Sequence, residues 1–128
     1  MKQKTQVMLK SSFPALGTPK SGKVRDMYDL GDQMLMVATD RISAFDVIMP
    51  DGIPGKGSVL NMISGLWLAK LAEVIPNHLI TRNTAEYPEV CRPYAEELDG
   101  RSMLVKKAEP LPVECVVRGY LSGSGWKD

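Results

Sequence analysis

Two strand-like stretches near the start of the chain predict a β-hairpin. Residues 24–30 and 34–38 are rich in apolar and β-favouring side chains, and Gly31-Asp32 between them is a pair that favours tight turns. Residues 1–20 carry few apolar side chains and several turn-forming ones, so they are expected to lead into the fold without forming a full element. Residues 39–57 are rich in proline and glycine and are predicted to be mostly loop.

An apolar stripe with helical spacing follows this predicted loop. Ser58 is a suitable N-cap and Pro76-Asn77 ends the pattern. The stripe consists of Val59, Ile63, Leu66, Trp67 and Val74, with Leu60 and Leu71 beside it. Such spacing places apolar side chains on one helix face. We therefore expect one main helix, packed on the strands.

Three further short stretches continue the strand pattern. Residues 78–81, 103–105 and 113–117 are predicted strands, and residues 95–98 a short helix. The connections between strands are too short for the helical crossovers that parallel strands need. The chain is therefore predicted to be an α+β domain, in which one main helix packs on an antiparallel β-sheet. Four methionines are expected in the core: Met34, Met36, Met62 and Met103.

Composition narrows the function classes. The length of 128 residues corresponds to one domain or part of one. With 16 basic against 15 acidic side chains and a net charge of +1, nothing favours nucleic acid or a membrane as a partner. Aromatic residues make up 6%, too few for a base-stacking platform. The chain has no membrane-length apolar run and no hydrophobic signal core, so a cytoplasmic location is expected. Cys91, Cys115 and His78 lack the spacing of a disulfide scaffold or a zinc site, and no metal site is expected in this chain.

Residues 17–23 fit most of the phosphate-loop pattern G-x-x-x-x-G-K, but their context argues against that motif. Val24 stands where Mg²⁺ ligation needs Ser or Thr, and a strand rather than a helix follows. A glycine at a strand edge can still bring backbone close to a polyphosphate, as the glycine-rich loop of protein kinases does over ATP. Gly22 would allow this approach, with Lys23 and Arg25 on opposite faces of the strand. The alternative is a simple turn with solvated basic residues, which the pattern by itself favours.

Two other segments carry candidate chemistry. Residues 39–46 combine two carboxylates, two hydroxyls and an arginine, a composition typical of binding loops, although Asp40 and Asp46 would equally well cap turns. The segment of residues 103–111 begins with a predicted strand and continues into a connection stiffened by proline. The sheet leaves backbone N–H and C=O groups of such a connection unpaired, and these groups can bind the edge of an adenine. An ordinary strand connection with solvated charges is the favoured alternative for this segment in isolation.

The last predicted strand delivers Arg118 into a run of glycines and hydroxyls at residues 119–124. A guanidinium beside small hydroxyl side chains and free backbone N–H groups is a good receptor for phosphate or carboxylate. The usual alternative is a buried salt bridge, but Glu114 on the same strand face is roughly 13 Å away along the strand. An anion site is therefore the favoured interpretation. Cys115, on the opposite face, is expected to be a small buried hydrophobe.

Four segments, taken in order, resemble one family, the SAICAR synthetases (phosphoribosylaminoimidazole-succinocarboxamide synthases) of purine biosynthesis. The segments are residues 21–28 (SGKVRDMY), 38–46 (ATDRISAFD), 53–57 (IPGKG) and 112–124 (PVECVVRGYLSGS). Ser122 stands where many members of the family have Thr or Ala. The resemblance implies a kinase/ATP-grasp-like N-terminal lobe. It also implies an ATP-dependent ligase that joins 5-amino-1-(5-phosphoribosyl)imidazole-4-carboxylate (CAIR) to L-aspartate, giving SAICAR, ADP and phosphate.

The resemblance also implies roles for individual residues. The flap over the ATP phosphates would comprise Gly22, Lys23 and Arg25. The apolar walls around adenine would be Val24, Met103 and Leu111. The hinge that binds the adenine edge would include Lys106, Ala108 and Glu109. The CAIR and aspartate pocket would use Ser43, Asp46, Lys56, Arg118 and Ser124. No catalytic residue or general base is assigned on this chain.

Members of the family are longer than this chain and carry a second, α/β portion after the last matching segment. That portion is expected to supply the Mg²⁺ ligands and further basic residues. Residues 21–128 are therefore expected to be the N-terminal ATP-binding domain, truncated before that portion and inactive alone. Two alternatives remain: a stand-alone nucleotide-binding module without ligase activity and, less favoured, a purely structural domain. The sequence does not predict the oligomeric state.

Overall fold

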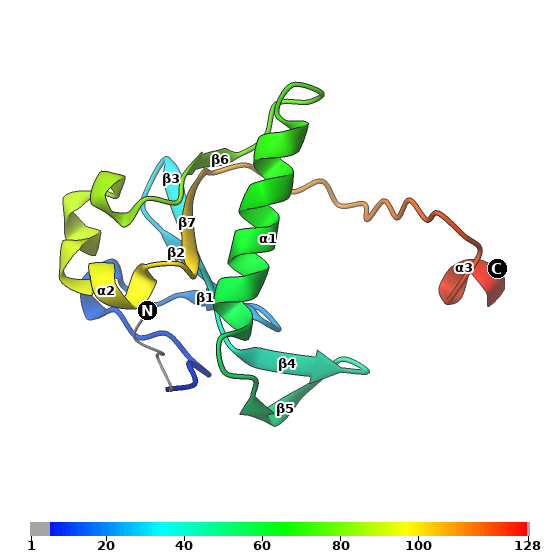
Figure 1. Cartoon of the computed structure of the whole chain (residues 1–128), viewed down its shortest axis with the longest axis horizontal. Helices are drawn as coiled ribbons and strands as arrows, with labels where there is room; N and C mark the ends of the chain where they lie inside the picture. The colour runs from blue at the N-terminus through cyan, green and yellow to red at the C-terminus, as the bar shows by residue number, and fades with distance from the viewer. Residues whose placement is uncertain (1–5, 128) are drawn as a thin grey trace.

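A computed structural model describes residues 6–127, apart from the side chains of Ser124 and Lys127. Its main layer is a five-stranded antiparallel sheet with the strand order β1-β2-β3-β7-β6 (Figure 1). These strands are β1 (Lys20–Ser21), β2 (Arg25–Asp29), β3 (Gln33–Ala38), β7 (Ser102–Lys106) and β6 (Leu79–Thr81). The α+β class, the hairpin formed by β2 and β3, and strands near residues 79–81 and 103–105 are confirmed.

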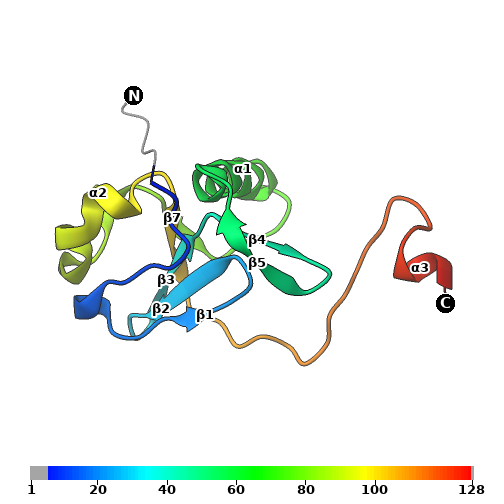
Figure 2. The same ribbon diagram turned by 90° about the horizontal axis from the view of Figure 1, so that it is seen from below.

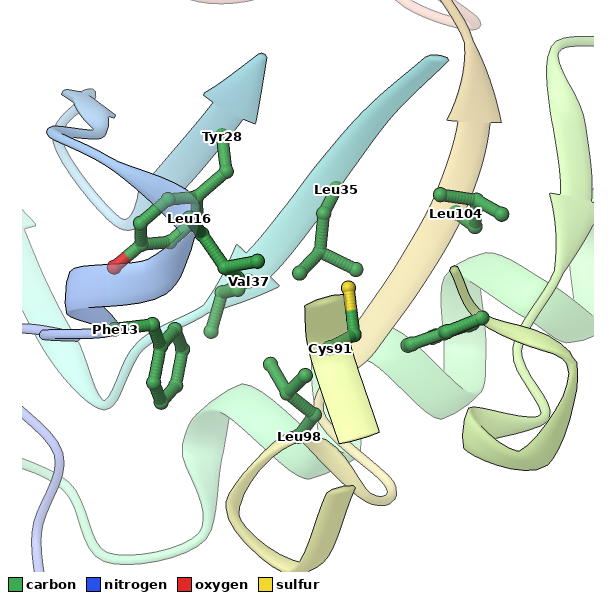
Figure 3. Close-up of a cluster of buried hydrophobic side chains, with 9 residues drawn as sticks. Phe13, Leu16, Tyr28, Leu35, Val37, Cys91, Leu98 and Leu104 are labelled. Atoms are coloured by element: carbon green, nitrogen blue, oxygen red, sulfur yellow. The ribbon is translucent and has the colours of Figure 1, made fainter. Parts of the chain in front are cut away.

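One face of the sheet carries the hydrophobic core. Tyr28, Leu35 and Leu104 are paired across β2, β3 and β7, so their side chains share this face. The face is covered by the predicted short helix α2 (Ala95–Leu98) and by the 3-10 helices η1 (Pro14–Leu16), η2 (Thr84–Glu86) and η3 (Glu89–Tyr94). The cluster of buried side chains in Figure 3 comprises Phe13, Leu16, Tyr28, Leu35, Val37, Tyr87, Cys91, Leu98 and Leu104. Phe13 and Leu16 thus tie the lead-in residues to the domain.

The other face of the sheet carries the long helix α1 (Lys56–Leu71), which runs beside β7 in Figure 1. The predicted apolar stripe does not face the sheet: its member Leu66 is 63% exposed. The helix instead buries Gly57, Asn61 and Gly65. The stripe prediction was wrong because small residues allow the helix backbone to approach the sheet closely, a factor that hydrophobic spacing does not contain. Met62, predicted in the core, is exposed on the same outer side, whereas Met103 is buried.

Two contacts hold the buried side of α1 against the sheet. The Asn61 Nδ2 donates hydrogen bonds of 3.1 Å to the backbone oxygens of Gly100 and Ser102. The start of the helix is at Lys56, two residues before the predicted N-cap, and Gly55 precedes it with φ +77°. The cap comes from a distant side chain, because Asp40 accepts a 2.9 Å hydrogen bond from the Gly57 N–H.

Residues 39–57 are not mostly loop, contrary to the prediction. They form a separate two-stranded antiparallel sheet of β4 (Arg41–Ala44) and β5 (Val47–Gly52). The turn residues Phe45 and Asp46 have φ of 49° and 65°. Two consecutive positive φ values are typical of the turn that best matches the twist of a hairpin. The sequence signal was weak because neither residue is a glycine.

The chain after β7 forms no further strand. Residues 113–117 have no ladder partner and are exposed, so the prediction of a final strand was wrong, as was that of a buried Cys115. β-favouring side chains make a strand only where a neighbouring backbone offers hydrogen bonds, and both sides of β7 are already taken by β3 and β6. Figures 1 and 2 show the segment leading away from the sheet to the short helix α3 (Ser124–Lys127). Within residues 6–127, no helix combines the length and apolarity needed to cross a membrane.

Candidate functional site

A small apolar pocket of about 160 Å³ lies between the sheet and α1. Residues from β2, β3, β7 and the helix meet there, and the lining comprises Val24, Arg25, Met36, Ala38, Leu60, Asn61, Ser64 and Met103. Three of the residues expected around ATP, Val24, Arg25 and Met103, are therefore brought together from distant parts of the sequence. The contributions of Asn61 and Ser64 were not predicted. Asn61 and Ser64 face the sheet because α1 buries its glycine side, with Gly57 and Gly65. The sequence had predicted that the apolar stripe would face the sheet instead.

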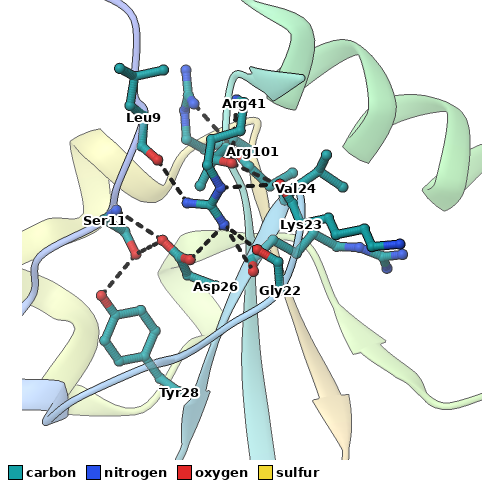
Figure 4. Close-up of polar contacts among 12 residues, drawn as sticks. Leu9, Ser11, Gly22, Lys23, Val24, Asp26, Tyr28, Arg41 and Arg101 are labelled. Atoms are coloured by element: carbon teal, nitrogen blue, oxygen red, sulfur yellow. Dashed lines mark hydrogen bonds and ion pairs between the residues drawn. The ribbon is translucent and has the colours of Figure 1, made fainter. Parts of the chain in front are cut away.

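The loop that leads into β2 borders this pocket, and we call residues 22–25 the glycine loop. All four of its carbonyl oxygens accept hydrogen bonds. The Gly22 oxygen accepts from Arg41 Nη2 at 2.9 Å and the Lys23 oxygen from Arg41 Nε at 3.2 Å (Figure 4). The Val24 oxygen accepts from the N–H and the hydroxyl of Thr39 at 3.0 and 2.8 Å. The Arg25 oxygen accepts from the Gly22 N–H at 2.7 Å and from Arg41 Nη2 at 3.2 Å. The loop is therefore fixed from its inner side.

A buried carboxylate holds Arg41 in this position. Asp26 Oδ1 accepts from Arg41 Nη2 at 2.8 Å, and both groups are buried. The other oxygen of Asp26 accepts from the backbone N–H and the hydroxyl of Ser11 at 2.9 and 2.8 Å. The Ser11 hydroxyl also contacts the Tyr28 hydroxyl at 2.9 Å. Burial acts to raise the pKa of Asp26, but the hydrogen bonds from Arg41 and Ser11 outweigh it and hold the pKa below its ordinary value.

This carboxylate predicts a specific loss of stability in acid. Because the pKa of Asp26 is lower in the folded chain than in the unfolded chain, the unfolded state takes up the proton first as the pH falls. The stabilisation by Asp26 is complete above the ordinary value of 3.8 and is lost as the pH falls through that value towards the lower folded pKa. Urea unfolding between pH 7 and pH 3 should show this loss, and Asp26→Asn should be less stable at pH 7 but lose less on acidification. An equal pH dependence in Asp26→Asn and the unmodified chain would contradict the assignment; Asp51→Asn, which removes an exposed carboxylate, is the control.

A second buried pair lies beside the first. Asp40 accepts hydrogen bonds from Arg101 Nη1 at 3.3 Å, from the Met8 N–H at 2.9 Å and from the Gly57 N–H at 2.9 Å. The three donors belong to different parts of the chain. Asp40 therefore joins the N-terminal segment, α1 and Arg101, the residue that precedes β7. Asp40 therefore caps the first turn of α1, a distant element, whereas the sequence suggested only the capping of a local turn.

The glycine loop is joined to the β4–β5 turn by an exposed ion pair between Lys23 and Asp46. The hydrogen bond and charge of Asp46 raise the pKa of Lys23, and the same contact lowers the pKa of Asp46. A residue expected at the ATP phosphates therefore contacts one expected at the CAIR or aspartate pocket. An open hollow beside this pair is lined by Leu9, Lys10, Ser21, Gly22, Lys23, Arg41 and Ile48.

Other predicted site residues are not brought into the apolar pocket. Lys106 is exposed at the end of β7, and Ala108 and Glu109 are exposed beyond it. Leu111, expected as an adenine wall, is 83% exposed and does not line the pocket with Val24 and Met103. Unpaired backbone after a strand was the only sequence signal for this hinge, and that signal does not fix where the segment runs.

The residues expected around CAIR and aspartate lie on three separate elements. Ser43 is half-buried in β4 and Lys56 is the first residue of α1. Arg118 lies against Gly123 and Gly125 in the exposed segment after β7, so it does not stand on a strand as predicted. Ser124 begins α3, and its side chain lies outside the described part of the chain.

The described carboxylates around the candidate site do not form a metal-binding group. Among the described residues, no three His, Cys, Asp or Glu side chains are grouped closely enough to hold a metal ion. Asp46, the carboxylate beside the glycine loop, is engaged by Lys23. These residues do not fit a Mg²⁺ site.

Comparison with known proteins decides the family. The family model described as SAICAR synthetase matches residues 18–128. The chain belongs to the SAICAR synthetase family. The SAICAR synthetase resemblance of the four sequence segments is thereby confirmed.

Individual relatives agree with this family. The phosphoribosylaminoimidazole-succinocarboxamide synthase of Desulfosudis oleivorans is 62% identical over 95% of this chain, and that of Geobacter sulfurreducens is 59% identical over 96%. In both cases the chain spans 42% of the relative's length. A SAICAR synthase from Saccharomyces cerevisiae, solved in complex with SAICAR, superposes with a TM-score of 0.82 at 37% identity, over 95% of this chain and 44% of that one.

Proposed function

We propose that this chain is the ATP-binding part of an ATP-dependent ligase that joins CAIR to L-aspartate and yields SAICAR, ADP and phosphate. The adenine of ATP would occupy the apolar pocket between Val24 and Met103. Its phosphates would extend along the glycine loop towards Lys23. Membership of the SAICAR synthetase family supports this proposal, together with the name that its relatives share.

The observation that carries the proposal is the junction at Val24. This residue belongs both to the apolar pocket and to the glycine loop, so an apolar ring and a polyphosphate attached to it could bind side by side. Ligand sites are commonly apolar clefts with a few well-placed polar groups. Here Lys23 supplies a positive charge at the edge of such a cleft, and the glycine at position 22 permits a close backbone approach.

The chemistry requires ATP because a carboxylate is a poor electrophile. The CAIR carboxylate oxygen would attack the γ-phosphorus, the bond to ADP would break, and an acyl phosphate would form. The aspartate amine would then attack the acyl carbon, and phosphate would leave as the amide forms. Catalysis of this kind depends largely on positioning and on neutralising charge around the phosphoryl group.

The substrate pocket would use Ser43, Asp46 and Lys56 from the body of the domain, with Arg118 and Ser124 from the segment after β7. The ion pair between Lys23 and Asp46 supports an arrangement in which the phosphate subsite lies next to the substrate subsite. The hinge would still be Lys106, Ala108, Glu109 and Leu111. The Mg²⁺ that accompanies ATP would take its ligands from outside this chain. Two cysteines without a disulfide, Cys91 and Cys115, support a reducing, cytoplasmic location.

Titration calorimetry tests ATP binding directly. We expect the chain to bind ATP weakly, and Mg²⁺ to strengthen binding little because the ligands lie elsewhere. Lys23→Ala should weaken ATP binding about tenfold, through loss of a charged contact, and leave adenosine binding unchanged. Met103→Ala should weaken both ligands, since it removes an apolar wall.

The matched control is Lys70→Ala, which removes an exposed lysine near the other end of α1, where it lies over Trp67. It should leave both affinities unchanged. Equal losses of ATP affinity for Lys23→Ala and Lys70→Ala would mean that the loss reflects the net charge of the chain and not a contact of Lys23. Absence of ATP binding by the unmodified chain would refute the ATP site in this chain. A strong Mg²⁺ dependence would refute the placement of the metal ligands.

A further inference from the structure

The glycine loop has a directional property that follows from peptide geometry. In a planar trans peptide, the C=O of one residue and the N–H of the next point in opposite directions. No peptide bond in the described chain is cis. Since the oxygens of Gly22 and Lys23 both point to Arg41, the N–H groups of Lys23 and Val24 point away from it.

These two N–H groups are available to a ligand. Within residues 6–127, neither the Lys23 N–H nor the Val24 N–H donates a hydrogen bond to another protein group. Both belong to the loop that borders the apolar pocket and the open hollow. Successive backbone N–H groups that converge on one side of a loop form a favourable site for an anion. The Lys23 ammonium adds a positive charge on the same loop.

We propose that Arg41 is the positioning residue that turns these N–H groups outward, so that the backbone of Lys23 and Val24 can donate to the phosphates of ATP. The inference rests on the proposed function for the identity of the ligand. It adds a role for a buried arginine whose guanidinium is engaged by carbonyl and carboxylate oxygens of the chain itself. Arg41 acts on the phosphate site through the carbonyl groups behind it.

An arginine suits this role because its guanidinium is a rigid planar fork with five donors. The Arg41 guanidinium donates five hydrogen bonds, of which three reach the glycine loop at the oxygens of Gly22, Lys23 and Arg25. The remaining two anchor the guanidinium to the Leu9 oxygen at 2.7 Å and to Asp26. A lysine has a single nitrogen, so it could not bind the oxygens of Gly22 and Lys23 from two separate atoms.

Arg101 offers a matched comparison. It is also a buried arginine paired with a buried carboxylate, Asp40, and it also donates to a backbone oxygen, that of Ala38 at 3.4 Å. Neither of these bonds involves the glycine loop. A purely structural role for Arg41 predicts that the two arginines behave alike, whereas a positioning role predicts that only Arg41 affects the loop N–H groups.

The test compares Arg41→Lys with Arg101→Lys in the 128-residue chain. Both variants should be less stable to urea. Arg41→Lys should lose ATP affinity about tenfold or more and should lose the ATP-induced NMR shifts of the Lys23 and Val24 amides. Arg101→Lys should keep ATP affinity within about twofold and keep those shifts. Equal affinity losses in the two variants, or unchanged amide shifts in Arg41→Lys, would overturn the proposal.

A measurement on the unmodified chain keeps the proposal testable if Arg41→Lys does not fold. The Lys23 and Val24 amides should exchange rapidly with solvent without ligand and become protected on addition of inorganic tripolyphosphate. Slow exchange without ligand, or no protection by tripolyphosphate, would overturn the proposal. This probe also separates the two proposals: protection by tripolyphosphate without binding of ATP would refute the ATP site and support an anion site at the outward N–H groups of the glycine loop.

Discussion

Replacing Asp40 with alanine is expected to lower the free energy of unfolding by about 3–5 kcal/mol. The side chain of Asp40 is fully buried, and its removal leaves the Arg101 guanidinium, itself buried, without a countercharge. The N–H groups of Met8 and Gly57 lose their acceptor at the same time. Each buried donor left without a partner adds to the cost. Urea unfolding followed by circular dichroism measures the loss.

Asp46→Ala is the matched control, because it also removes a carboxylate from an ion pair in the same stretch of sequence. The pair of Asp46 with Lys23 is exposed to solvent, so the loss of the ion pair costs little, and alanine at the positive φ of this turn position adds about 1 kcal/mol. Asp40→Asn should fall between the two, since an amide oxygen can still accept from one backbone N–H. If Asp40→Ala and Asp46→Ala destabilise equally, burial is not what distinguishes the two carboxylates.

Replacing Gly57 with alanine is expected to cost about 2–3 kcal/mol, even though alanine is the better helix former. A Cβ at this position would lie 2.2 Å from the Ala38 oxygen and 2.8 Å from its carbonyl carbon. Both atoms belong to backbone of the central strand β3, which cannot rotate away as a side chain could. The helix would have to move off the sheet. Urea unfolding is again the measurement, and ATP affinity should fall as well, because Asn61 and Ser64 of α1 line the pocket.

Two variants on α1 serve as controls for Gly57→Ala. Gly65→Ala places its Cβ 2.1 Å from the Arg82 guanidinium, but a flexible side chain can shift, so the cost should be smaller. Leu66→Lys changes an exposed position and should stay within about 0.5 kcal/mol of the unmodified chain. A large loss for Leu66→Lys and none for Gly57→Ala would mean that the apolar stripe, not the glycine side, faces the sheet.

Asp40 and Gly57 are coupled in the structure, which links stability to the candidate site. The Gly57 N–H donates to Asp40, and the same glycine lies against Ala38, a residue of the pocket. The position of α1 therefore sets one wall of the pocket through contacts at its first turn. Arg41, adjacent to Asp40 in sequence, holds the glycine loop that forms another edge. Neighbouring residues thus fix two sides of the site.

The sequence alone determined the features that depend on local preference. The β2–β3 hairpin follows from alternating side chains around Gly31-Asp32, and the antiparallel class follows from the short connections between strands. The ordered segments that resemble SAICAR synthetases were also readable directly, and the family is confirmed. These features need only neighbours along the chain, or residue identity itself.

Only the tertiary structure decided the features that depend on distant partners. The stripe containing Leu66 indicated a helix correctly but not its buried side, because that side is chosen by the close approach of Gly57 to β3. Residues 113–117 favour a strand by composition, yet they pair with no strand of the described chain and so leave Arg118 on an exposed segment. In the sequence, Arg41 is one of several polar residues in its segment. Only the fold shows that its guanidinium binds Gly22, Lys23 and Asp26. Hydrogen bonds and close packing between residues distant in the sequence decide these positions. Such contacts produce no periodic pattern of residue types, so the sequence alone does not predict them.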